Sequence, residues 1–267
     1  VYTITDQITV LRDGASIATW NTKEATNDMV VKAMVGRELT EQYPKRDVKI
    51  GDTILELKDF TQEGVFENIS FKLHRGEILG LVGLVGAGRT ETMQALFGIT
   101  KPDRGEVYLK GQKVEFKKPV DAIKNGLAYV TEDRKGEGLV LPMSIAHNIT
   151  LPSMKELSRK IFVKQKEEKD KVGKEIEDLK VKTTSPNLAV KNLSGGNQQK
   201  VVLAKWMLKN PDVIIFDEPT RGIDVGAKAE IYKLMNEFVS EGKAIIMISS
   251  ELPEAMGMSD RILVLSN

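Results

Sequence analysis

Five runs of apolar residues recur along the chain, each short enough to be one strand. They are residues 77–82, 127–131, 213–216, 244–248 and 262–265. Unbroken apolar runs of this length predict strands buried on both faces. Segments with helical periodicity lie between them, at residues 91–97, 119–125, 193–210 and 228–238. Strands that alternate with helices predict an α/β fold with a mostly parallel sheet covered on both faces.

Other parts of the chain have a different pattern. Further strands are predicted at residues 54–58, 69–73 and 107–110, where glycines punctuate the sequence. Residues 142–182 are charged and helix-forming, without the alternation of a strand. Their dense mixture of charges at residues 164–174 is typical of a solvated helical face rather than of a binding tract.

The first residues predict a small separate unit. Strand-like runs at residues 8–11 and 15–20 flank an Asp-Gly turn, which is a hairpin signal. A helical pattern follows at residues 22–35 and ends before a glycine. Residues 37–52 contain a proline and several charges, and we interpret them as a linker.

An internal repeat links this unit to the other end of the chain. Residues 4–11 read ITDQITVL and residues 258–265 read MSDRILVL. The similarity is either chance between two strands or a sign that the first residues are the tail of a preceding copy of the same domain. The start at Val1, without a signal-peptide pattern, is interpreted as a cut. We hypothesise that the hairpin supplies edge strands next to Val264, in the same or a neighbouring molecule.

Composition limits the function without deciding it. The 267 residues are 41% apolar and 29% charged, as in a globular protein with a core. A net charge of +1 gives no electrostatic argument for nucleic-acid binding. The sequence has no cysteine for disulfides or metal sites, and no apolar run approaches the roughly 20 residues of a membrane-spanning helix. His74 and His147 lie outside any motif, and we interpret them as surface or packing residues.

The candidate chemistry begins after the first buried run. Residues 83–90 read GLVGAGRT, the spacing of a phosphate-binding loop between a strand and a helix. Glycines let successive N–H groups point into one concavity, and the Thr90 hydroxyl suits Mg²⁺. Such a turn can also serve tight packing alone. Arg89 replaces the usual lysine; its planar fork pairs with phosphate but cannot sit in the same place, so we expect nucleotide binding with inefficient hydrolysis.

Two further motifs follow in the second half of the chain. Residues 213–218 read VIIFDE, an apolar strand that ends in two carboxylates. Asp217 suits the Mg²⁺ shell and Glu218 suits the attacking water. Residues 193–200 read LSGGNQQK and open a helix.

In this order the three motifs resemble those of ATP-binding-cassette (ABC) ATPases, whose signature is of the L-S-G-G-Q type. The resemblance covers residues 53–267 and implies a P-loop NTPase cassette truncated at its C-terminus. Its parts are a mixed, mostly parallel core sheet, an antiparallel β-subdomain and an α-helical subdomain at about residues 132–195. It also implies that the signature closes over nucleotide held by a partner cassette.

A closer resemblance is to the second cassette of the two-cassette ATPases of ribose, galactose and xylose importers. It rests on residues 83–91, 131–135, 193–200 and 217–224. Residues 1–36 then match the tail of a first cassette in the same polypeptide. The resemblance implies ATP and Mg²⁺ as cofactors and sugar import through a separate permease. It also implies a peripheral position on the cytoplasmic face of the inner membrane, with no membrane span, no nucleic acid and, as an option, a homodimer of this fragment.

The resemblance implies these site residues. Asp217 and Glu218 are catalytic; Thr90, Asp217 and Glu132 bind metal; Gly83, Gly86, Ala87, Gly88, Arg89, Thr90, Glu91, Glu132, Ser194, Gly195, Gly196, Asn197 and Ser250 bind nucleotide. Departures from the family pattern concentrate on one site. Glu132 stands where most cassettes have a glutamine, Ser250 where they have the switch histidine, and Asn197 replaces the signature glutamine. Phe60 or Phe66 could stack on adenine or be core.

These departures imply an asymmetric pair of sites. The signature of this chain completes a good site on the first cassette, and its own phosphate site is degenerate. Two alternatives stay open. Arg89 and Ser250 also suit a nucleotide-binding regulatory half without turnover. A soluble cassette ATPase that acts on nucleic acid or ribosomes is disfavoured by the near-neutral charge and by the lack of a long coiled coil after the phosphate loop.

Overall fold

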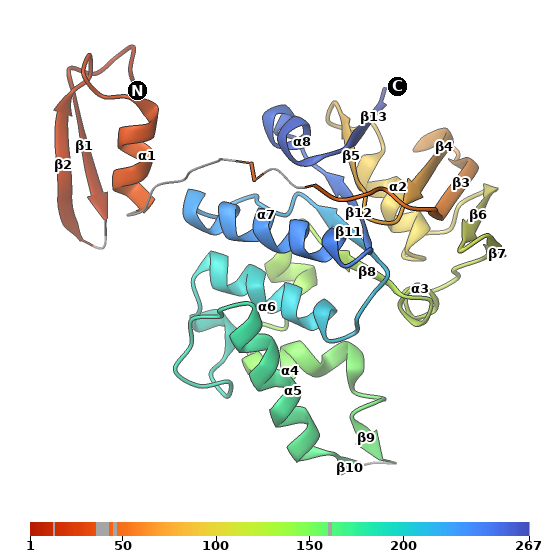
Figure 1. The fold of residues 1–267 in the computed structure, drawn as a ribbon. Coiled ribbons are helices and arrows are strands. Elements are labelled where there is room, and N and C mark those ends of the chain that lie inside the picture. Colours follow the sequence, from red (N-terminus) through yellow and green to blue (C-terminus); the bar gives the residue numbers. More distant parts are fainter. Residues whose placement is uncertain (13, 36–42, 45–46, 160–161, 267) are drawn as a thin grey trace.

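A five-stranded parallel sheet forms the centre of the molecule, in the order β13-β5-β12-β11-β8 (Figure 1). The computed structural model describes residues 1–12, 14–35, 43–44, 47–159 and 162–266. The strands are β5 (Ile78–Gly83), β8 (Leu127–Val130), β11 (Val213–Asp217), β12 (Ala244–Ile248) and β13 (Arg261–Leu265). All five predicted apolar runs are therefore strands. Every residue of β8, β11 and β12 is buried, which explains why these runs show no alternation.

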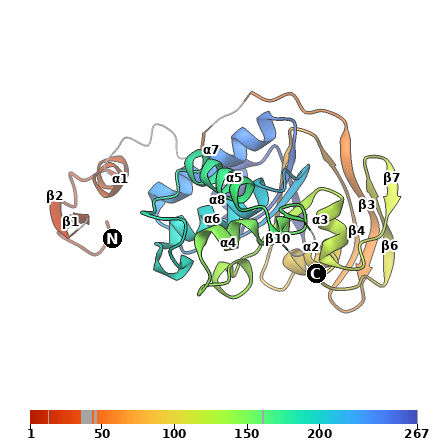
Figure 2. The same ribbon diagram turned by 90° about the horizontal axis from the view of Figure 1, so that it is seen from below.

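Helices connect these strands and pack on the sheet (Figures 1 and 2). They are α2 (Arg89–Leu96), α3 (Pro119–Lys124), α6 (Gly195–Met207), α7 (Val225–Ser240) and α8 (Leu252–Met258). Helix α7 begins before Lys228, where the periodicity starts, because Asp224 caps it. The Asp224 Oδ1 accepts a hydrogen bond from the Ala227 N–H at 2.9 Å. The pattern does not predict α8, which is short and has a proline in its first turn.

A second, antiparallel sheet packs beside the first, in the order β4-β3-β6-β7. Its strands are β3 (Thr53–Gln62), β4 (Phe66–His74), β6 (Arg104–Leu109) and β7 (Gln112–Val114). Helix α2 contacts both β4 and β5, and the buried residues of the two sheets form one hydrophobic core. The β-subdomain implied by the resemblance is therefore present, with strands longer than predicted.

The charged region folds mainly into helices, α4 (Ile145–Thr150) and α5 (Gln165–Asp178), with the short 3-10 turn η2 (Leu151–Ser153). A second 3-10 turn, η3 (Val190–Asn192), follows it just before the signature. In α5 only Val172 is buried, so the dense charges do form a solvated face. The sequence pattern does not predict the short strands β9 (Ser158–Arg159) and β10 (Phe162–Val163), which pair here. Strands of two residues are too short to show a period.

The first residues form the predicted unit, with strands β1 (Gln7–Arg12) and β2 (Ala15–Asn21) and helix α1 (Asn27–Val35). The helix does not start at Thr22, because Thr22 to Thr26 form a turn. The N–H groups of Glu24 and Ala25 both donate to the Asn21 carbonyl. The predicted glycine stop, the turn residue Asp13 and half of the predicted linker lie outside the described residues.

The edge-strand hypothesis is wrong within one chain. Strands β1 and β2 form a two-stranded sheet of their own, and among the described residues β13 pairs only with β5. Val264 of β13 is 68% exposed. Figure 1 shows the β1–β2–α1 unit at one side of the molecule and β13 in the cassette. Pairing with a neighbouring molecule stays a hypothesis.

No helix within the described ranges is both long and apolar enough to cross a membrane.

Candidate nucleotide site

The phosphate loop has the strand–loop–helix context that the sequence predicts. It leaves β5 at Gly83 and enters α2 at Arg89. Gly88 caps the helix with φ 79°, and a Cβ there would lie 2.9 Å from the Phe66 Cβ and the Val65 carbonyl oxygen. Both the left-handed backbone and the close approach of β4 therefore require glycine. Leu84 and Val85 at the loop tip are exposed, so packing in the core does not explain the whole loop.

Thr90 and Asp217 meet beneath the loop. The Thr90 hydroxyl donates to the Asp217 Oδ1 at 3.1 Å, although the two residues are far apart in sequence. The other oxygen, Oδ2, accepts a hydrogen bond from the Tyr129 hydroxyl at 2.7 Å. A hydroxyl and a carboxylate are oxygen donors of the kind that Mg²⁺ prefers. These residues therefore fit the Mg²⁺ that the sequence predicts.

Burial shapes the electrostatics of this pair. Asp217 is 1% exposed, and burial raises its pKa above the ordinary value, against the hydrogen bonds from Tyr129 and Thr90. Burial also raises the pKa of Tyr129, helped by the Asp217 charge, so the phenol stays protonated and donates. The hydroxyl of a buried tyrosine usually needs a hydrogen-bond partner. The presence of Tyr129 in an apolar run is therefore the sequence signal that could have identified it as a supporting residue.

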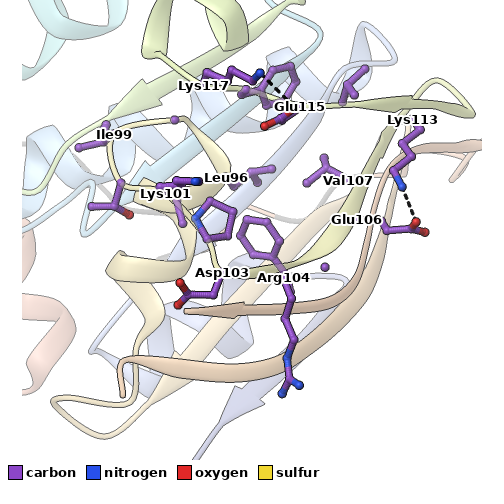
Figure 3. A pocket seen from close by; sticks show the side chains of 18 residues that line it. Leu96, Ile99, Lys101, Asp103, Arg104, Glu106, Val107, Lys113, Glu115 and Lys117 are labelled. Atoms are coloured by element: carbon purple, nitrogen blue, oxygen red, sulfur yellow. Dashed lines mark hydrogen bonds and ion pairs between the residues drawn. The ribbon is translucent and has the colours of Figure 1, made fainter. Parts of the chain in front are cut away.

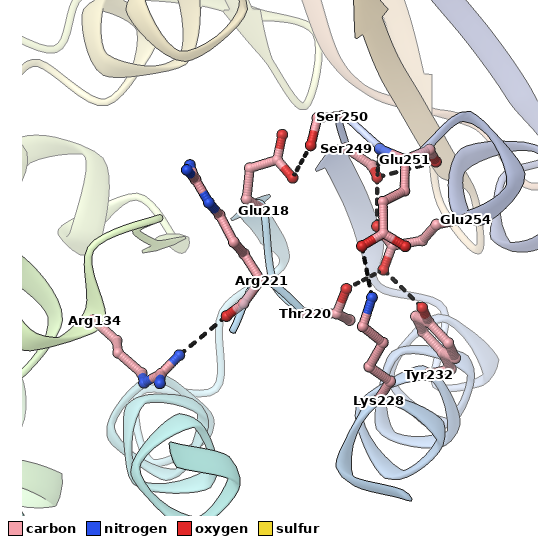
Figure 4. Close-up of polar contacts among 10 residues, drawn as sticks. All are labelled: Arg134, Glu218, Thr220, Arg221, Lys228, Tyr232, Ser249, Ser250, Glu251 and Glu254. Atoms are coloured by element: carbon pink, nitrogen blue, oxygen red, sulfur yellow. Dashed lines mark hydrogen bonds and ion pairs between the residues drawn. The ribbon is translucent and has the colours of Figure 1, made fainter. Parts of the chain in front are cut away.

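Glu218 and Ser250 follow neighbouring strands and touch each other. The Ser250 hydroxyl donates to the Glu218 Oε2 at 2.9 Å (Figure 4). Glu218 has φ 48°, a left-handed conformation that costs on the order of 1–3 kcal/mol in a residue other than glycine. Its N–H donates to the Ile248 carbonyl at 3.1 Å, which holds it there. The structure thus places the predicted catalytic carboxylate beside the residue at the predicted switch position.

Arg89 reaches the same pair of loops. Its Nη1 donates to the Ser249 carbonyl oxygen at 3.2 Å, one residue before Ser250. The arginine thereby links the phosphate loop to the end of β12. Glu91, in the first turn of α2, is exposed.

The signature begins α6, and its neighbours come from other segments. Ser194 precedes the helix and does not cap it with its side chain; its Oγ accepts a hydrogen bond from the Asn197 amide at 3.0 Å. The Asn197 Oδ1 accepts another from the Lys182 N–H at 2.8 Å. A Cβ on Gly195 would lie 2.8 Å from Arg134 Nη2, and one on Gly196 would lie 2.8 Å from the Ala227 Cβ. Close packing therefore requires glycine at position 196, whereas at position 195 the flexible end of Arg134 could move aside.

A brace from the loop after β8 supports this arrangement. Arg134 donates to the carbonyl oxygens of Arg221 at 3.1 Å and of Gly222 at 3.4 Å. It opens η1 (Arg134–Gly138), a π-type turn that the sequence pattern does not predict. The Glu132 carboxylate pairs with the Arg221 guanidinium. The role of Glu132 as a metal ligand stays a prediction.

Phe60 and Phe66 belong to the core. They are 2% and 5% exposed and stack on each other with centroids 5.7 Å apart. Neither therefore presents an open face to adenine here.

A cavity of about 630 Å³ lies between the end of α2 and the antiparallel sheet (Figure 3). Both signs of charge line it, and two of its lysines, Lys113 and Lys117, pair with Glu106 and Glu115. These pairs offset the positive charge that an anion would need, so the cavity is no rival to the phosphate loop.

Comparison with known proteins gives a consistent result. The profile of the ABC transporter family matches residues 66–221. The ribose import ATP-binding protein RbsA of Oceanobacillus iheyensis is 55% identical over 265 residues, which cover 99% of this chain and 53% of that protein. The protein of the same name from Bacillus subtilis is 53% identical over 264 residues, covering 99% and 54%. The chain thus spans about half the length of the curated relatives it matches.

Solved structures share the fold. A nucleotide-free ATP-binding cassette from an ABC transporter superposes with a TM-score of 0.69 at 21% identity, covering 80% of this chain and 88% of that one. The predicted fold class, a P-loop NTPase cassette, is therefore confirmed. Because the family profile matches more than half of the chain, and because the phosphate loop and the acidic end of β11 meet in one site, this chain belongs to the ABC transporter family.

Proposed function

We propose that this chain contains the second nucleotide-binding cassette of an ATP-hydrolysing protein that powers sugar import through a separate permease. One observation carries the proposal. Thr90 and Asp217 meet under a phosphate loop, in a chain that is 55% identical to a ribose import ATP-binding protein. Ribose appears in the name of that relative. For this chain we propose only that the transported sugar is a monosaccharide.

The residues around the loop divide the binding of MgATP among them. The N–H groups of residues 86–90 would hold the phosphates at the start of α2, and that of Ala87 donates to the Leu84 carbonyl oxygen in this structure. Because Tyr129 occupies the Asp217 Oδ2, the Oδ1 that meets Thr90 is the oxygen left to face the metal. Mg²⁺, when bound, supplies positive charge against the phosphate oxygens.

Hydrolysis at this site is proposed to be slow. Glu218 would orient the attacking water, and Ser250 holds its carboxylate through a hydrogen bond. A serine is shorter than the histidine it replaces and cannot carry a positive charge toward the terminal phosphate. One N–H of the Arg89 guanidinium donates to the Ser249 carbonyl oxygen, so part of its donor capacity is used within the protein. A regulatory half without turnover is the second candidate, favoured by this same contact.

The signature is proposed to act on a partner. Ser194 is exposed at the start of α6, with Gly195 and Gly196 behind it. We propose that these residues complete the ATP site of a first cassette in the same polypeptide. The internal repeat and the double length of the relatives support this, with residues 1–36 as the tail of that cassette. One solved relative in fold is described as a dimeric post-hydrolysis state bound to ADP and phosphate.

The proposed location is the cytoplasmic face of the membrane, where the helical region would meet the permease. Co-expression of the two-cassette protein with its permease tests this. We expect the two to co-purify, and to show ATP turnover that depends on the permease. Co-purification with ribosomes or nucleic acid instead would favour the rival soluble ATPase.

The variant Glu218→Gln in the two-cassette protein tests the asymmetry. We expect it to lower turnover by less than half, because the first-cassette site keeps its own carboxylate. Complete loss of turnover would contradict the asymmetry, and no change would favour the regulatory half.

A further inference from the structure

A buried carboxylate lies behind the two catalytic loops. Glu254 of α8 is 1% exposed, and no ion pair among the described residues includes it. Three hydroxyl groups donate to it instead (Figure 4). Thr220 donates to Oε1 at 2.6 Å and Tyr232 to the same oxygen at 2.8 Å, and Ser249 donates to Oε2. A buried carboxylate needs such donors, since leaving it without them is strongly unfavourable.

The donors come from the segments that carry the site. Thr220 lies two residues after Glu218, in the loop that follows β11. Ser249 lies directly before Ser250, in the loop that follows β12. Its carbonyl oxygen accepts a hydrogen bond from Arg89. Because β11 and β12 are neighbouring parallel strands, both loops leave the same edge of the sheet. Glu254 therefore joins the loop of Glu218 to the loop of Ser250.

Tyr232 closes this cluster from α7. It is 3% exposed, and burial with the Glu254 charge raises its pKa, so its hydroxyl stays a donor. The ring of Tyr43, from the segment before the cassette, packs on it with centroids 5.5 Å apart. A side chain on Gly257 of α8 would collide with the Tyr43 ring. Tyr43 thus packs over the Tyr232 side of the cluster.

We propose that Glu254 is a positioning residue that holds the Glu218 loop and the Ser250 loop in register through its acceptor oxygens. The proposal rests on the proposed function only in naming these loops catalytic. It requires that both loops loosen together when the acceptor is removed. Charge is not the essential property, because a glutamine could keep its oxygen toward Thr220 and Tyr232 and present its amide to Ser249.

Amide hydrogen exchange of the 267-residue chain, read by mass spectrometry, tests the proposal. Glu254→Met keeps the length but offers no oxygen to three buried hydroxyls. We expect exchange to speed up by about tenfold or more at residues 218–221 and 249–251, since hydrogen bonds to a carboxylate are the strong ones. Exchange at residues 107–109 of β6, in the antiparallel sheet, should stay within about twofold, because the hydrogen bonds of this cluster lie outside that sheet.

Glu254→Gln is the discriminating variant. We expect it to return exchange to within about threefold of the unmodified chain, because the amide oxygen keeps two of the three donors. The proposal would be overturned if Glu254→Met and Glu254→Gln sped up exchange in the two loops equally, or if neither did. Either result would indicate that Glu254 only fills space, because both side chains fill it. Glu251→Met is the matched control; it breaks only an exposed pair with Lys228 and should leave residues 218–221 unchanged.

Tyr232→Phe keeps the test decisive if Glu254→Met fails to fold. It removes one donor from α7, outside both loops, and should speed exchange in both by about threefold. Loosening confined to one loop, or spread evenly over the chain, would overturn the proposal. The measurement needs neither ATP nor a permease, so failure of the transport function would leave its result unaffected.

Discussion

The hydrogen bond from Tyr129 to Asp217 gives the sharpest quantitative prediction. Tyr129→Phe removes only the hydroxyl oxygen from a residue that is 3% exposed. The Asp217 Oδ2 then loses its donor at 2.7 Å and stays buried. Hydrogen bonds to charged groups contribute about 1.5–3 kcal/mol. We expect the free energy of unfolding to fall by about that amount at pH 7.

The dependence on pH has a definite sign. Burial already raises the pKa of Asp217 above its unfolded value, and removing Tyr129 raises it further. An acid whose pKa is raised by folding destabilises the folded state progressively as the pH rises from the unfolded pKa to the folded pKa, and the penalty is complete above the folded pKa, where the ionised form must stay buried. The difference between the variant and the unmodified chain should therefore be full at neutral pH. It should shrink as the pH falls through the folded pKa of Asp217.

Urea unfolding followed by circular dichroism at several pH values measures this difference. Tyr108→Phe is the matched control, because Tyr108 donates to the Glu106 carboxylate at the same 2.7 Å but on the surface. We expect the control to change stability little at any pH. A Tyr129→Phe difference as small as that of the control, or one that grows in acid, would refute the reasoning.

Three other predictions follow from the site and its surroundings. Arg89→Lys combined with Ser250→His should raise the ATPase rate of this chain, because both groups then match the general cassette pattern; no increase in steady-state phosphate release would count against the degenerate-site account. Gly88→Ala should destabilise the chain by more than the roughly 1 kcal/mol that a left-handed alanine costs, because its Cβ would meet Phe66 and the Val65 carbonyl oxygen. Gly64 also has a left-handed φ, 73°, but a Cβ there would meet open space, so Gly64→Ala is the comparison. Equal melting temperatures of the two variants would contradict this reasoning. Burial lowers the pKa of Lys205 to about 8. Between that pH and the ordinary lysine pKa of 10.5 the unfolded chain binds one more proton than the folded chain, so stability rises with pH there. Lys205→Met should flatten this rise by up to about 3 kcal/mol, and an unchanged slope in urea titrations would disprove the assignment.

The sequence was sufficient for the centre of the fold. Continuous apolar runs predicted all five strands of the parallel sheet, because strands buried on both faces leave no other pattern. Local capping was harder to predict. Helix α1 starts after the Thr22 turn and α7 starts at the Asp224 cap, and both starts depend on one or two local hydrogen bonds rather than on periodicity. The pair β9–β10 and helix α8 are too short for a period to show.

The site was predictable where a motif names the residue. Thr90, Asp217 and Glu218 lie where the motifs place them, and the first two are in contact. The supporting residues were not predictable, because their partners are distant in sequence. Tyr129 reaches Asp217 across a strand pair, Arg134 reaches the loop before α7, and Glu254 gathers three hydroxyls from three segments. The sequence around Glu254 gives no indication of these donors.

ATP binding to this chain with and without Mg²⁺ is the most direct test of the account, by isothermal titration of the unmodified protein and of Thr90→Val. We predict that Mg²⁺ tightens binding to the unmodified chain, because the proposed role of Thr90 and Asp217 is to hold the metal against the phosphates. Thr90→Val should bind ATP without Mg²⁺ as well as the unmodified chain does and should lose the gain from Mg²⁺. Absence of ATP binding, or a gain from Mg²⁺ that survives in Thr90→Val, would contradict the assignment of this site.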